Sequence, residues 1–365
     1  LGVYFNQEKS DKIFSTKTTP DIFELFTILN FFGFGRTPYM DGFEVPVNIC
    51  IEISSHALDQ GRLNDIDWFN ATSILNISSD HLDYHKNISA YRDAKFEIFK
   101  NKSLVKLLDD KSYKFHHKYD FIVNDENKIL VISKDNNFSD IYYEIKEISI
   151  KETTFEISIN KPSKEYNFKE RKKFKFCCNV FPDFNVHNLV FAICSIGFGG
   201  FLENKINDLN YLRLPKGRAE IIRDIPSNII IDYAHNHEAV RLFLSSIKNQ
   251  YDNLIVIIGC GGGRDKSKRS KMLSAAIRDS SKVIFTSDNS RSEDFEDIFK
   301  DAVKNNNIEN VVKIKDRKQA IIFGTKEISN NDCLVILGKG HEETQEENNQ
   351  ISYFSDHEVV NEIYN

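Results

Sequence analysis

The stretch from Glu52 to Lys95 combines a carboxylate, candidate metal-binding histidines and a lysine in an unusual setting. Glu52 lies in the apolar run 47–53 (VNICIEI), and His81 follows a second strand-like run within 67–77. Short apolar runs of this kind predict β-strands. Because parallel α/β sheets bind ligands beyond the carboxyl ends of their strands, we expect these side chains to converge there.

Lys95 lies within a predicted helix, residues 87–100, on which Tyr91, Ala94 and Ile98 recur at helical spacing. The lysine falls at the edge of that apolar face, where burial disfavours the ammonium and lowers its pKa. A neutral lysine amine can capture carbon dioxide and become a carbamate, which is a metal ligand. The alternative is a lysine that extends over the apolar face to solvent.

The amino-acid composition limits the kinds of protein to which this chain can belong. The chain has 365 residues, 41% apolar and 28% charged, as in a soluble globular protein with two or three domain cores. The net charge of −6 argues against nucleic acid as the main partner, and the basic run 164–175 is expected to be a solvated strand or loop. No apolar stretch is long enough to insert into a membrane, and no cleavable signal is visible. The six cysteines have no metal-ligand spacing, which indicates reduced core thiols in a cytoplasmic protein, expected to be monomeric.

Strand and helix patterns alternate along most of the chain, which predicts an α/β fold. Residues 119–176 alternate apolar and polar instead, which predicts a small antiparallel β insertion, and an apolar helix is expected at 188–199. The segment 212–217 has the character of a linker, so we expect a central domain over residues 1–213 and a C-terminal domain over residues 214–365. In the C-terminal domain, predicted strands and helices alternate as in a doubly wound sheet. The strands are expected at 229–232, 254–259, 283–286 and 334–337, and the helices at 238–248, 270–278 and 294–305.

Eight motifs in a fixed order resemble those of the Mur ligase family. They are EISSHALDQGR, SSDHLDYHKNISAYRDAKFEIF, FNVHN, GRAE, DYAHNHEAV, GCGGGRDKSKR, SDNSR and GKGHE. The resemblance runs from about Thr18 to Asp356 and is strongest to the MurE type, which adds the third residue to the peptidoglycan stem peptide. It implies the central domain of a Mur ligase, a parallel sheet with helices, followed by a Rossmann-like C-terminal domain.

The resemblance also implies an ATP-dependent ligase that uses Mg²⁺. Joining a carboxylate to an amine needs an activated acyl group, which transfer of the γ-phosphoryl group of ATP supplies. Glu52 and His81 match ligands of one Mg²⁺, and a carbamylated Lys95 supports the second. Together these three residues form the implied catalytic and metal site.

Five further positions match residues of the family that contact the UDP-muramoyl-dipeptide substrate. Arg62 offers a planar fork suited to carboxylate or phosphate, although a surface arginine after a turn is the alternative. The family usually has asparagine before the paired threonines, where this chain has Lys17. The five are Thr18, Thr19, Ser54, Gln60 and Arg62.

A nucleotide site is implied at the start of the C-terminal domain. Asp232 ends a strand, where a carboxylate can bind both ribose hydroxyls, and capping of the next helix is the alternative. After it the family usually has Thr-Pro, where this chain has Asn236-His237. The adenine, phosphate and ribose contacts carried over are Asn188, Arg218, Asp232, Tyr233 and His235.

The glycine-rich motif GCGGGRDK follows a strand, and glycines there let a backbone approach a ligand closely. The family usually has aspartate where this chain has Gly263. Arg264 and Lys268 are expected either to line the cleft or to be solvated.

The acceptor amino acid decides the subclass. In MurE enzymes that use meso-diaminopimelate, the motif DNPR supplies an arginine for the distal carboxylate. Here Arg291 is kept and Ser290 replaces the proline. In GKGHE, Gly338 and Glu342 match positions that hold the other end of the amino acid. We therefore expect meso-diaminopimelate as the acceptor, with the residues Asp288, Asn289, Arg291, Gly338 and Glu342.

The family's phosphate-binding loop, GTNGKTT, is expected about forty residues before Thr18, but only seventeen residues precede it and none match. We expect a fragment that is inactive or nearly so by itself. The alternatives are a lysine-adding or folylpolyglutamate-type ligase, or a muropeptide-binding or scaffolding module without a phosphate-binding loop. An in-frame GTNGKTT upstream of Leu1 favours the ligase, and a start codon beside Leu1 favours the module.

Overall fold

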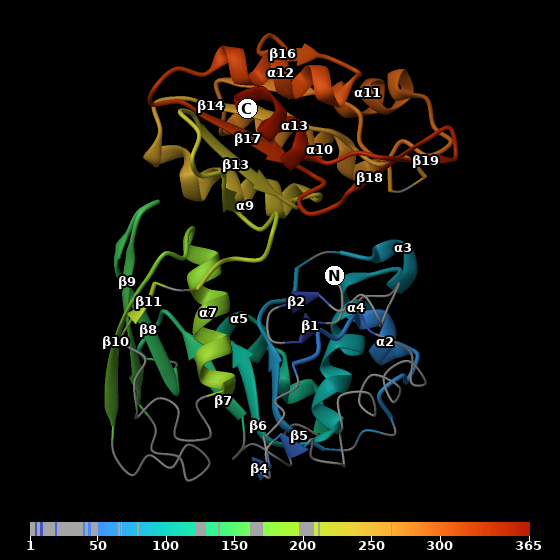
Figure 1. The fold of residues 1–365 in the computed structure, drawn as a ribbon. Helices are drawn as coiled ribbons and strands as arrows, with labels where there is room; N and C mark the ends of the chain where they lie inside the picture. The colour runs from blue at the N-terminus through green and yellow to red at the C-terminus, as the bar shows by residue number, and fades with distance from the viewer. Residues whose placement is uncertain are drawn as a thin grey trace. The chain divides into compact units, whose positions relative to one another are not determined.

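The computed structural model shows an α/β fold (Figure 1). The chain divides into two compact units, residues 1–142 with 160–170 and 194–199, and residues 143–159 with 171–193 and 200–365. The structure describes residues 4–5, 8–9, 19, 39–40, 43–44, 50–64, 66, 68–78, 80–120, 129–137, 139–160, 171–196, 208–210, 212–263 and 265–365.

A seven-stranded sheet has the strand order β11-β10-β9-β8-β7-β6-β5. β5 to β8 pair in parallel, β9 and β10 are antiparallel, and β10 and β11 are parallel. The strands predicted within 119–176 are therefore present, but they form no separate insertion, because β7 and β8 extend the parallel sheet. β7 is buried at every position, as in a strand covered on both faces. The strand bounds are β5 Trp68–Ile74, β6 Lys102–Asp109, β7 Ile129–Ser133, β8 Ile141–Ile148, β9 Thr153–Ile159, β10 Lys172–Cys178 and β11 Asp208–Leu209.

The helix predicted at 87–100 is α4 (Ile88–Phe96), capped by the Asn87 side chain and continued by the 3₁₀ turn η1 (Glu97–Lys100). α7 begins at Asp183 rather than at residue 188. The strand predicted at 47–53 is not seen in its described part, Cys50–Ile53, and the rest lies outside the described residues. The other helices before residue 200 are α2 Ser55–Asp59, α3 Leu82–His85, α5 Asp110–Tyr113, η2 His116–Lys118 and α7 Asp183–Ile196.

A six-stranded sheet has the order β12-β13-β17-β14-β15-β16, and every neighbouring pair is parallel except β12–β13. The strands and helices predicted for this half are all confirmed. Its strands are β12 Glu220–Ile221, β13 Asn228–Asp232, β14 Leu254–Ile258, β15 Lys282–Phe285, β16 Val311–Lys313 and β17 Cys333–Leu337. Its helices are α9 His237–Ile247, η5 Lys248–Gln250, α10 Ser267–Arg278, α11 Phe295–Val303, α12 Arg317–Glu327 and α13 Asp356–Tyr364.

Helices cover both faces of this sheet, α9, α10 and α11 on one and α12 and α13 on the other (Figure 1). Alternate strand residues supply the two cores: Ile230 and Val335 face the first set, Ile229 and Leu334 the second. The period of two along a strand produces this division. The carboxyl ends of β13, β14, β15 and β17 lie side by side in the sheet, so the loops after them form one candidate binding edge.

Short strand pairs complete the described structure: β1 Tyr4–Phe5 with β2 Glu8–Lys9, β3 Tyr39–Met40 with β4 Phe43–Glu44, and β18 Thr344–Glu347 with β19 Gln350–Tyr353. The chain has six cysteines, Cys50, Cys177, Cys178, Cys194, Cys260 and Cys333. Four are buried as expected, but Cys50 is exposed and Cys177 is partly exposed. In the part of the chain that the structure describes, no helix has the length and apolar character needed to cross a bilayer.

Candidate active site

Lys95 lies in the last turn of α4 and is half-buried, next to the buried Ala94 and Phe96. Its Nζ lies 5.2 Å from the centre of the Tyr91 ring. Burial lowers the pKa of Lys95, against the opposing effect of the Asp80 and Glu52 carboxylates. The predicted burial and the predicted direction of the pKa are confirmed. A lowered pKa increases the fraction of neutral amine, the form that reacts with carbon dioxide; the carbamate itself stays a prediction.

Asp80 is a residue of this region that the sequence analysis left without a role. Its carboxylate has a larger electrostatic effect on Lys95 than that of Glu52. The backbone N–H of His81 donates to Asp80 Oδ1 at 2.9 Å, and His81 Nε2 lies 3.8 Å from Asp80 Oδ2. The His81 side chain is 49% exposed, so its ring is open to a ligand. The sequence did show one sign of this arrangement, a carboxylate directly before the histidine after a strand.

The donor set of this region fits Mg²⁺ only in part. Mg²⁺ prefers six oxygen ligands and usually keeps several waters. Glu52 and Asp80 offer carboxylate oxygens, but within the described ranges no three His, Cys, Asp or Glu side chains gather to hold a metal. A carbamate on Lys95 would add the missing protein oxygens. The residues therefore fit Mg²⁺ in combination with oxygens from the carbamate, the substrate and water.

The residues predicted to contact the dipeptide gather around the start of α2. The backbone N–H of Ser54 donates to Thr19 Oγ1 at 2.7 Å, and the Ser54 hydroxyl caps α2. Arg62 Nη1 donates to the Thr19 carbonyl at 3.0 Å, and Arg62 Nε donates to Gln60 Oε1 at 3.0 Å. These contacts link four residues that are up to 43 positions apart. Thr18 lies outside the described residues.

Asp232 ends β13 and is almost fully buried. Burial raises its pKa, and the backbone N–H groups of Ala219 and Ala234, which donate at 2.7 and 2.8 Å, oppose this shift. The capping alternative is wrong, because Asn236 caps α9. The backbone of Tyr233 also hydrogen-bonds to this carboxylate, whose oxygens have further lone pairs for hydroxyl groups.

Tyr233 connects the predicted nucleotide residues to the predicted acceptor residues. The Arg218 guanidinium carbon lies 4.6 Å from the centre of the Tyr233 ring, and His235 Nδ1 lies 2.9 Å from the Tyr233 carbonyl oxygen. The Tyr233 hydroxyl donates to Glu342 Oε1 at 3.2 Å. Burial, with the negative charge of Glu342, raises the pKa of Tyr233 to about 12, so it stays a donor. Asn188 is an exposed residue of α7.

The predicted acceptor residues meet at the carboxyl ends of β15 and β17. Asn289 Nδ2 donates to Glu342 Oε2 at 3.1 Å, and Lys339 Nζ donates to Asn289 Oδ1 at 3.1 Å. A Cβ on Gly338 would lie 2.7 Å from Asp288 Oδ2, so glycine permits this close approach. The arrangement presents two carboxylates and one amide side by side. Lys339 was missed by the sequence analysis, although a lysine between two glycines after a buried strand is unusual.

Arg291 is a cationic residue of the same loop as Asp288 and Asn289. Its Nη1 donates to the Gly262 carbonyl at 2.7 Å and to the Asn289 carbonyl at 3.3 Å, and its Nε lies 3.4 Å from Glu346 Oε2. Nη2 has no hydrogen-bond partner within the described ranges. The backbone of Arg291 is left-handed, with φ 54°, which is costly for a residue with a side chain. The guanidinium is thus held in place, with one nitrogen left for a carboxylate.

The glycine-rich loop packs against the loop that carries Arg291. Gly262 N–H donates to the Asn289 carbonyl at 2.9 Å. A Cβ on Gly262 would lie 1.9 Å from the Ser290 carbonyl oxygen, so only glycine fits. Lys268 is partly exposed in α10, and Arg264 lies outside the described residues. The glycines therefore allow the backbones of the two loops to lie in contact.

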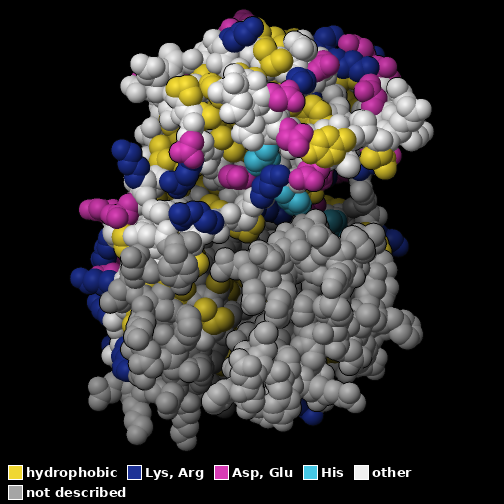
Figure 2. All heavy atoms as spheres, in the orientation of Figure 1, with side chains coloured by type: hydrophobic (Ala, Val, Ile, Leu, Met, Phe, Trp, Pro, Cys, Tyr) yellow, Lys and Arg dark blue, Asp and Glu magenta, His cyan; other side chains and the backbone are white. Residues whose placement is uncertain are grey.

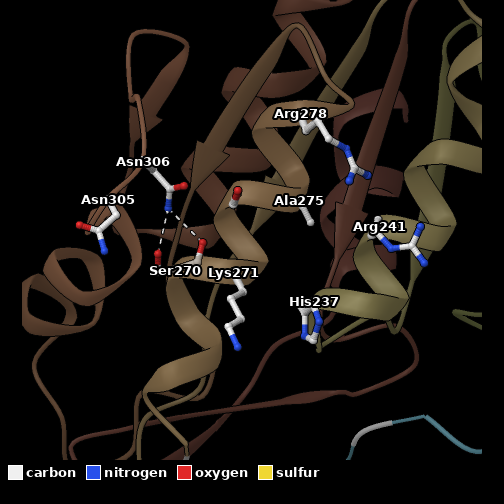
Figure 3. Close-up of a pocket in the computed structure, with 9 residues that line it drawn as sticks. His237, Arg241, Ser270, Lys271, Ala275, Arg278, Asn305 and Asn306 are labelled. Carbon is white, nitrogen blue, oxygen red and sulfur yellow. Dashed lines mark hydrogen bonds between the residues drawn. The ribbon is translucent and has the colours of Figure 1, made fainter.

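Two cavities lie within the described structure. One of about 330 Å³ lies between α9 and α10 (Figure 3) and is lined by His237, Arg241, Ser270, Lys271, Ser274, Ala275, Arg278, Asn305 and Asn306. Another of about 260 Å³ is lined by Leu58, Leu63, Asn64, Glu97, Lys100, Asn101 and Lys102. Neither includes a predicted site residue. On the coloured part of the face shown in Figure 2, acidic and basic side chains are interspersed.

The chain is an α/β protein in which the ends of the doubly wound strands bring acidic, basic and amide side chains together. Family models place it more narrowly. Residues 45–196 match the Mur ligase middle domain, and residues 217–340 match the Mur ligase, glutamate ligase domain. The chain belongs to the Mur ligase family.

Two curated relatives carry the name UDP-N-acetylmuramoyl-L-alanyl-D-glutamate–2,6-diaminopimelate ligase. The one from Wigglesworthia glossinidia brevipalpis is 34% identical over 86% of this chain and 63% of its own length. The one from Alkaliphilus oremlandii is 32% identical over 100% of this chain and 71% of its own length. A solved structure of the same name is 32% identical, with a TM-score of 0.51, over 85% of this chain and 63% of that chain. This chain therefore spans roughly two thirds of the length of the relatives that it matches.

Proposed function

We propose that this chain forms the acceptor-binding and magnesium-binding parts of an ATP-dependent ligase. The reaction adds meso-diaminopimelate to UDP-N-acetylmuramoyl-L-alanyl-D-glutamate in peptidoglycan precursor synthesis. The proposal includes cytoplasmic location, a monomeric state and the division into domains at residues 1–213 and 214–365. It rests on the relatives' printed names and on the chemistry of the acceptor pocket.

One observation carries the choice of acceptor. The loop from Asp288 to Arg291 places a carboxylate and an amide at one end and a guanidinium at the other, and Glu342 joins the acidic end. An amino acid with an ammonium at one end and a second carboxylate at the other complements this pattern. A planar guanidinium with Nη2 available suits that carboxylate better than a lysine ammonium would. L-lysine, which lacks the distal carboxylate, leaves Arg291 without a ligand.

The remaining predicted residues fit the steps of such a ligation. The D-glutamyl carboxylate is activated as an acyl phosphate, and the acceptor amine then attacks and phosphate leaves. Thr19, Ser54, Gln60 and Arg62 would hold the dipeptide beside Lys95. Mg²⁺, held by Glu52, His81 and a carbamylated Lys95, would neutralise charge on the phosphoryl oxygens.

The nucleotide residues belong to the other half of the reaction. Asp232 and His235 would contact the ribose of ATP, and Arg218 its phosphates, with Asn188 contributing to adenine binding. Tyr233 is assigned to the same group, and its hydrogen bond to Glu342 links that group to the acceptor pocket. A lysine-adding or folylpolyglutamate-type ligase, or a muropeptide-binding module, remains the alternative function.

Calorimetric titration of the chain with meso-diaminopimelate and L-lysine tests the acceptor. We expect meso-diaminopimelate to bind at least about tenfold more tightly, because one charge-assisted hydrogen-bonded pair is lost with lysine. Arg291→Ala should remove this preference. Arg241→Ala, a change of the same type in the cavity of Figure 3, should leave it intact.

Equal affinity for the two amino acids, or a preference that survives Arg291→Ala, would refute the assignment of the acceptor. Formation of the tripeptide product from ATP, the UDP-muramoyl-dipeptide and meso-diaminopimelate tests the reaction. Binding of the dipeptide without any product would favour the muropeptide-binding module.

A further inference from the structure

Lys339, the lysine of the GKG sequence, is buried beside the predicted acceptor residues. Lys339 follows β17, is 0% exposed and stands between Gly338, with φ 111°, and Gly340, with φ 53°. A Cβ on Gly340 would lie 2.8 Å from Tyr233 Cβ and 2.9 Å from the Gly217 carbonyl oxygen. The two glycines thus allow a backbone turn that side chains would obstruct, and the turn directs the lysine inward.

The Lys339 ammonium faces polar partners. Its Nζ lies 3.1 Å from Asn289 Oδ1, 3.5 Å from Glu342 Oε2 and 3.8 Å from Asp288 Oδ1. A charge removed from water is stable only when it is paired and hydrogen-bonded. Two carboxylates and one amide oxygen therefore lie within 3.8 Å of this single ammonium.

The same ammonium determines which way the Asn289 amide points. Asn289 Oδ1 accepts from Lys339 Nζ and also from the backbone N–H of Glu346, at 3.0 Å. With two donors on the oxygen, Nδ2 must lie on the other side, where it donates to Glu342 Oε2. One Nδ2 hydrogen and the outer lone pairs of the carboxylates remain for a ligand.

We propose that Lys339 is a positioning residue of the acceptor site, which fixes the orientation of the Asn289 amide. This inference rests on the proposed function, since it assumes that the pocket binds the acceptor amino acid.

Lys339→Met tests the role, because it keeps the length of the side chain and removes the charge. Without the ammonium, the oxygen of the Asn289 amide loses one of its two donors. We expect the affinity for meso-diaminopimelate to fall at least about tenfold. Because the lysine acts through that amide, we also expect the variant with both Lys339→Met and Asn289→Ala to bind within about threefold of Asn289→Ala alone. Lys318→Met, an exposed lysine on α12, is the matched control.

A role limited to stability would lower the melting temperature of Lys339→Met and leave its affinity unchanged, which would overturn the proposal; so would losses of affinity from Lys339→Met and Asn289→Ala that add in the double variant. If Lys339→Met fails to fold, Lys339→Met combined with Glu342→Gln removes both opposite charges, and near-UV circular dichroism reports whether the fold returns. We expect this variant to fold and to bind at least about tenfold more weakly than Glu342→Gln alone; equal affinity of the two would overturn the proposal. If the wild-type chain binds no amino acid, the proposed function fails together with the role of Lys339. If wild type and Lys339→Met bind with equal affinity, only the role of Lys339 is refuted.

Discussion

The buried ion pair between Arg317 and Asp356 offers the sharpest test of the structure. Arg317 Nε and Nη2 each donate to one oxygen of Asp356 at 2.8 Å, and both side chains are 0% exposed. Arg317 Nη2 also donates to the Leu337 carbonyl at 3.0 Å, and Nη1 donates to the Ser287 carbonyl at 3.4 Å. One guanidinium therefore joins α12, α13 and the carboxyl-terminal ends of β15 and β17, from which the acceptor residues extend.

Arg317→Met leaves the Asp356 carboxylate buried without its partner. Breaking a buried pair on one side costs about 3–5 kcal/mol, because the remaining charge stays out of water. For a domain of about 150–250 residues, each kcal/mol shifts the melting temperature by about 2–4 °C. We therefore expect the melting temperature to fall by about 6–20 °C, the product of these two ranges.

Scanning calorimetry of Arg317→Met beside Lys318→Met provides the measurement and its control. Lys318 belongs to the same helix and pairs with Glu362 of α13 at 2.6 Å, but those side chains are 49% and 60% exposed. An exposed pair contributes about 0–1 kcal/mol, so the control should shift the melting temperature by about 4 °C at most. Equal shifts for the two variants would show that Arg317 and Asp356 are not buried as a pair.

Two further predictions concern the glycine-rich loop and α4. Gly262→Ala should weaken meso-diaminopimelate binding at least about tenfold, since the added methyl group meets the Ser290 carbonyl and separates two loops. Gly263→Ala, at φ 62° and with the added Cβ at an ordinary contact distance of 3.6 Å from Arg291 Cδ, should lower stability by about 1 kcal/mol and keep that affinity. Titration calorimetry that shows the larger loss of affinity for Gly263→Ala would contradict the packing. Lys95, whose pKa is lowered by burial, should form a carbamate at lower pH than the exposed Lys100. ¹³C NMR in labelled bicarbonate, with Lys95→Met as reference, should show this signal growing as rising pH neutralises the amine; no difference from Lys95→Met refutes it.

The lowered pKa of Lys95 also determines how the contribution of this residue to the stability of the fold changes with pH. Its pKa is lower in the folded chain than in the unfolded chain, so the unfolded state binds more protons between the two values. Stability from this group is therefore lowest below the folded pKa and rises as pH increases toward the unfolded value of about 10.4.

The sequence pattern of a segment was sufficient to predict its structure where one kind of interaction dominates that segment. The apolar runs at β13, β14, β15 and β17 predicted their strands, because a strand covered on both faces must be apolar throughout. The helical spacing around Lys95 likewise predicted its half-buried setting and the direction of its pKa. The alternating residues of 119–176 indicated strands but not their partners, since alternation does not specify which strand lies alongside.

The sequence alone identified the Glu52–Lys95 stretch and the loops after the sheet strands as candidate site segments. Charged residues and glycines can be recognised from the residue type, without knowledge of the fold. Only the tertiary structure joined Tyr233 to Glu342, placed Lys339 under Asn289 and buried Arg317 against Asp356. These contacts link residues 39 to 109 positions apart. Their energies depend on the exclusion of water, and water is excluded only when distant segments pack together.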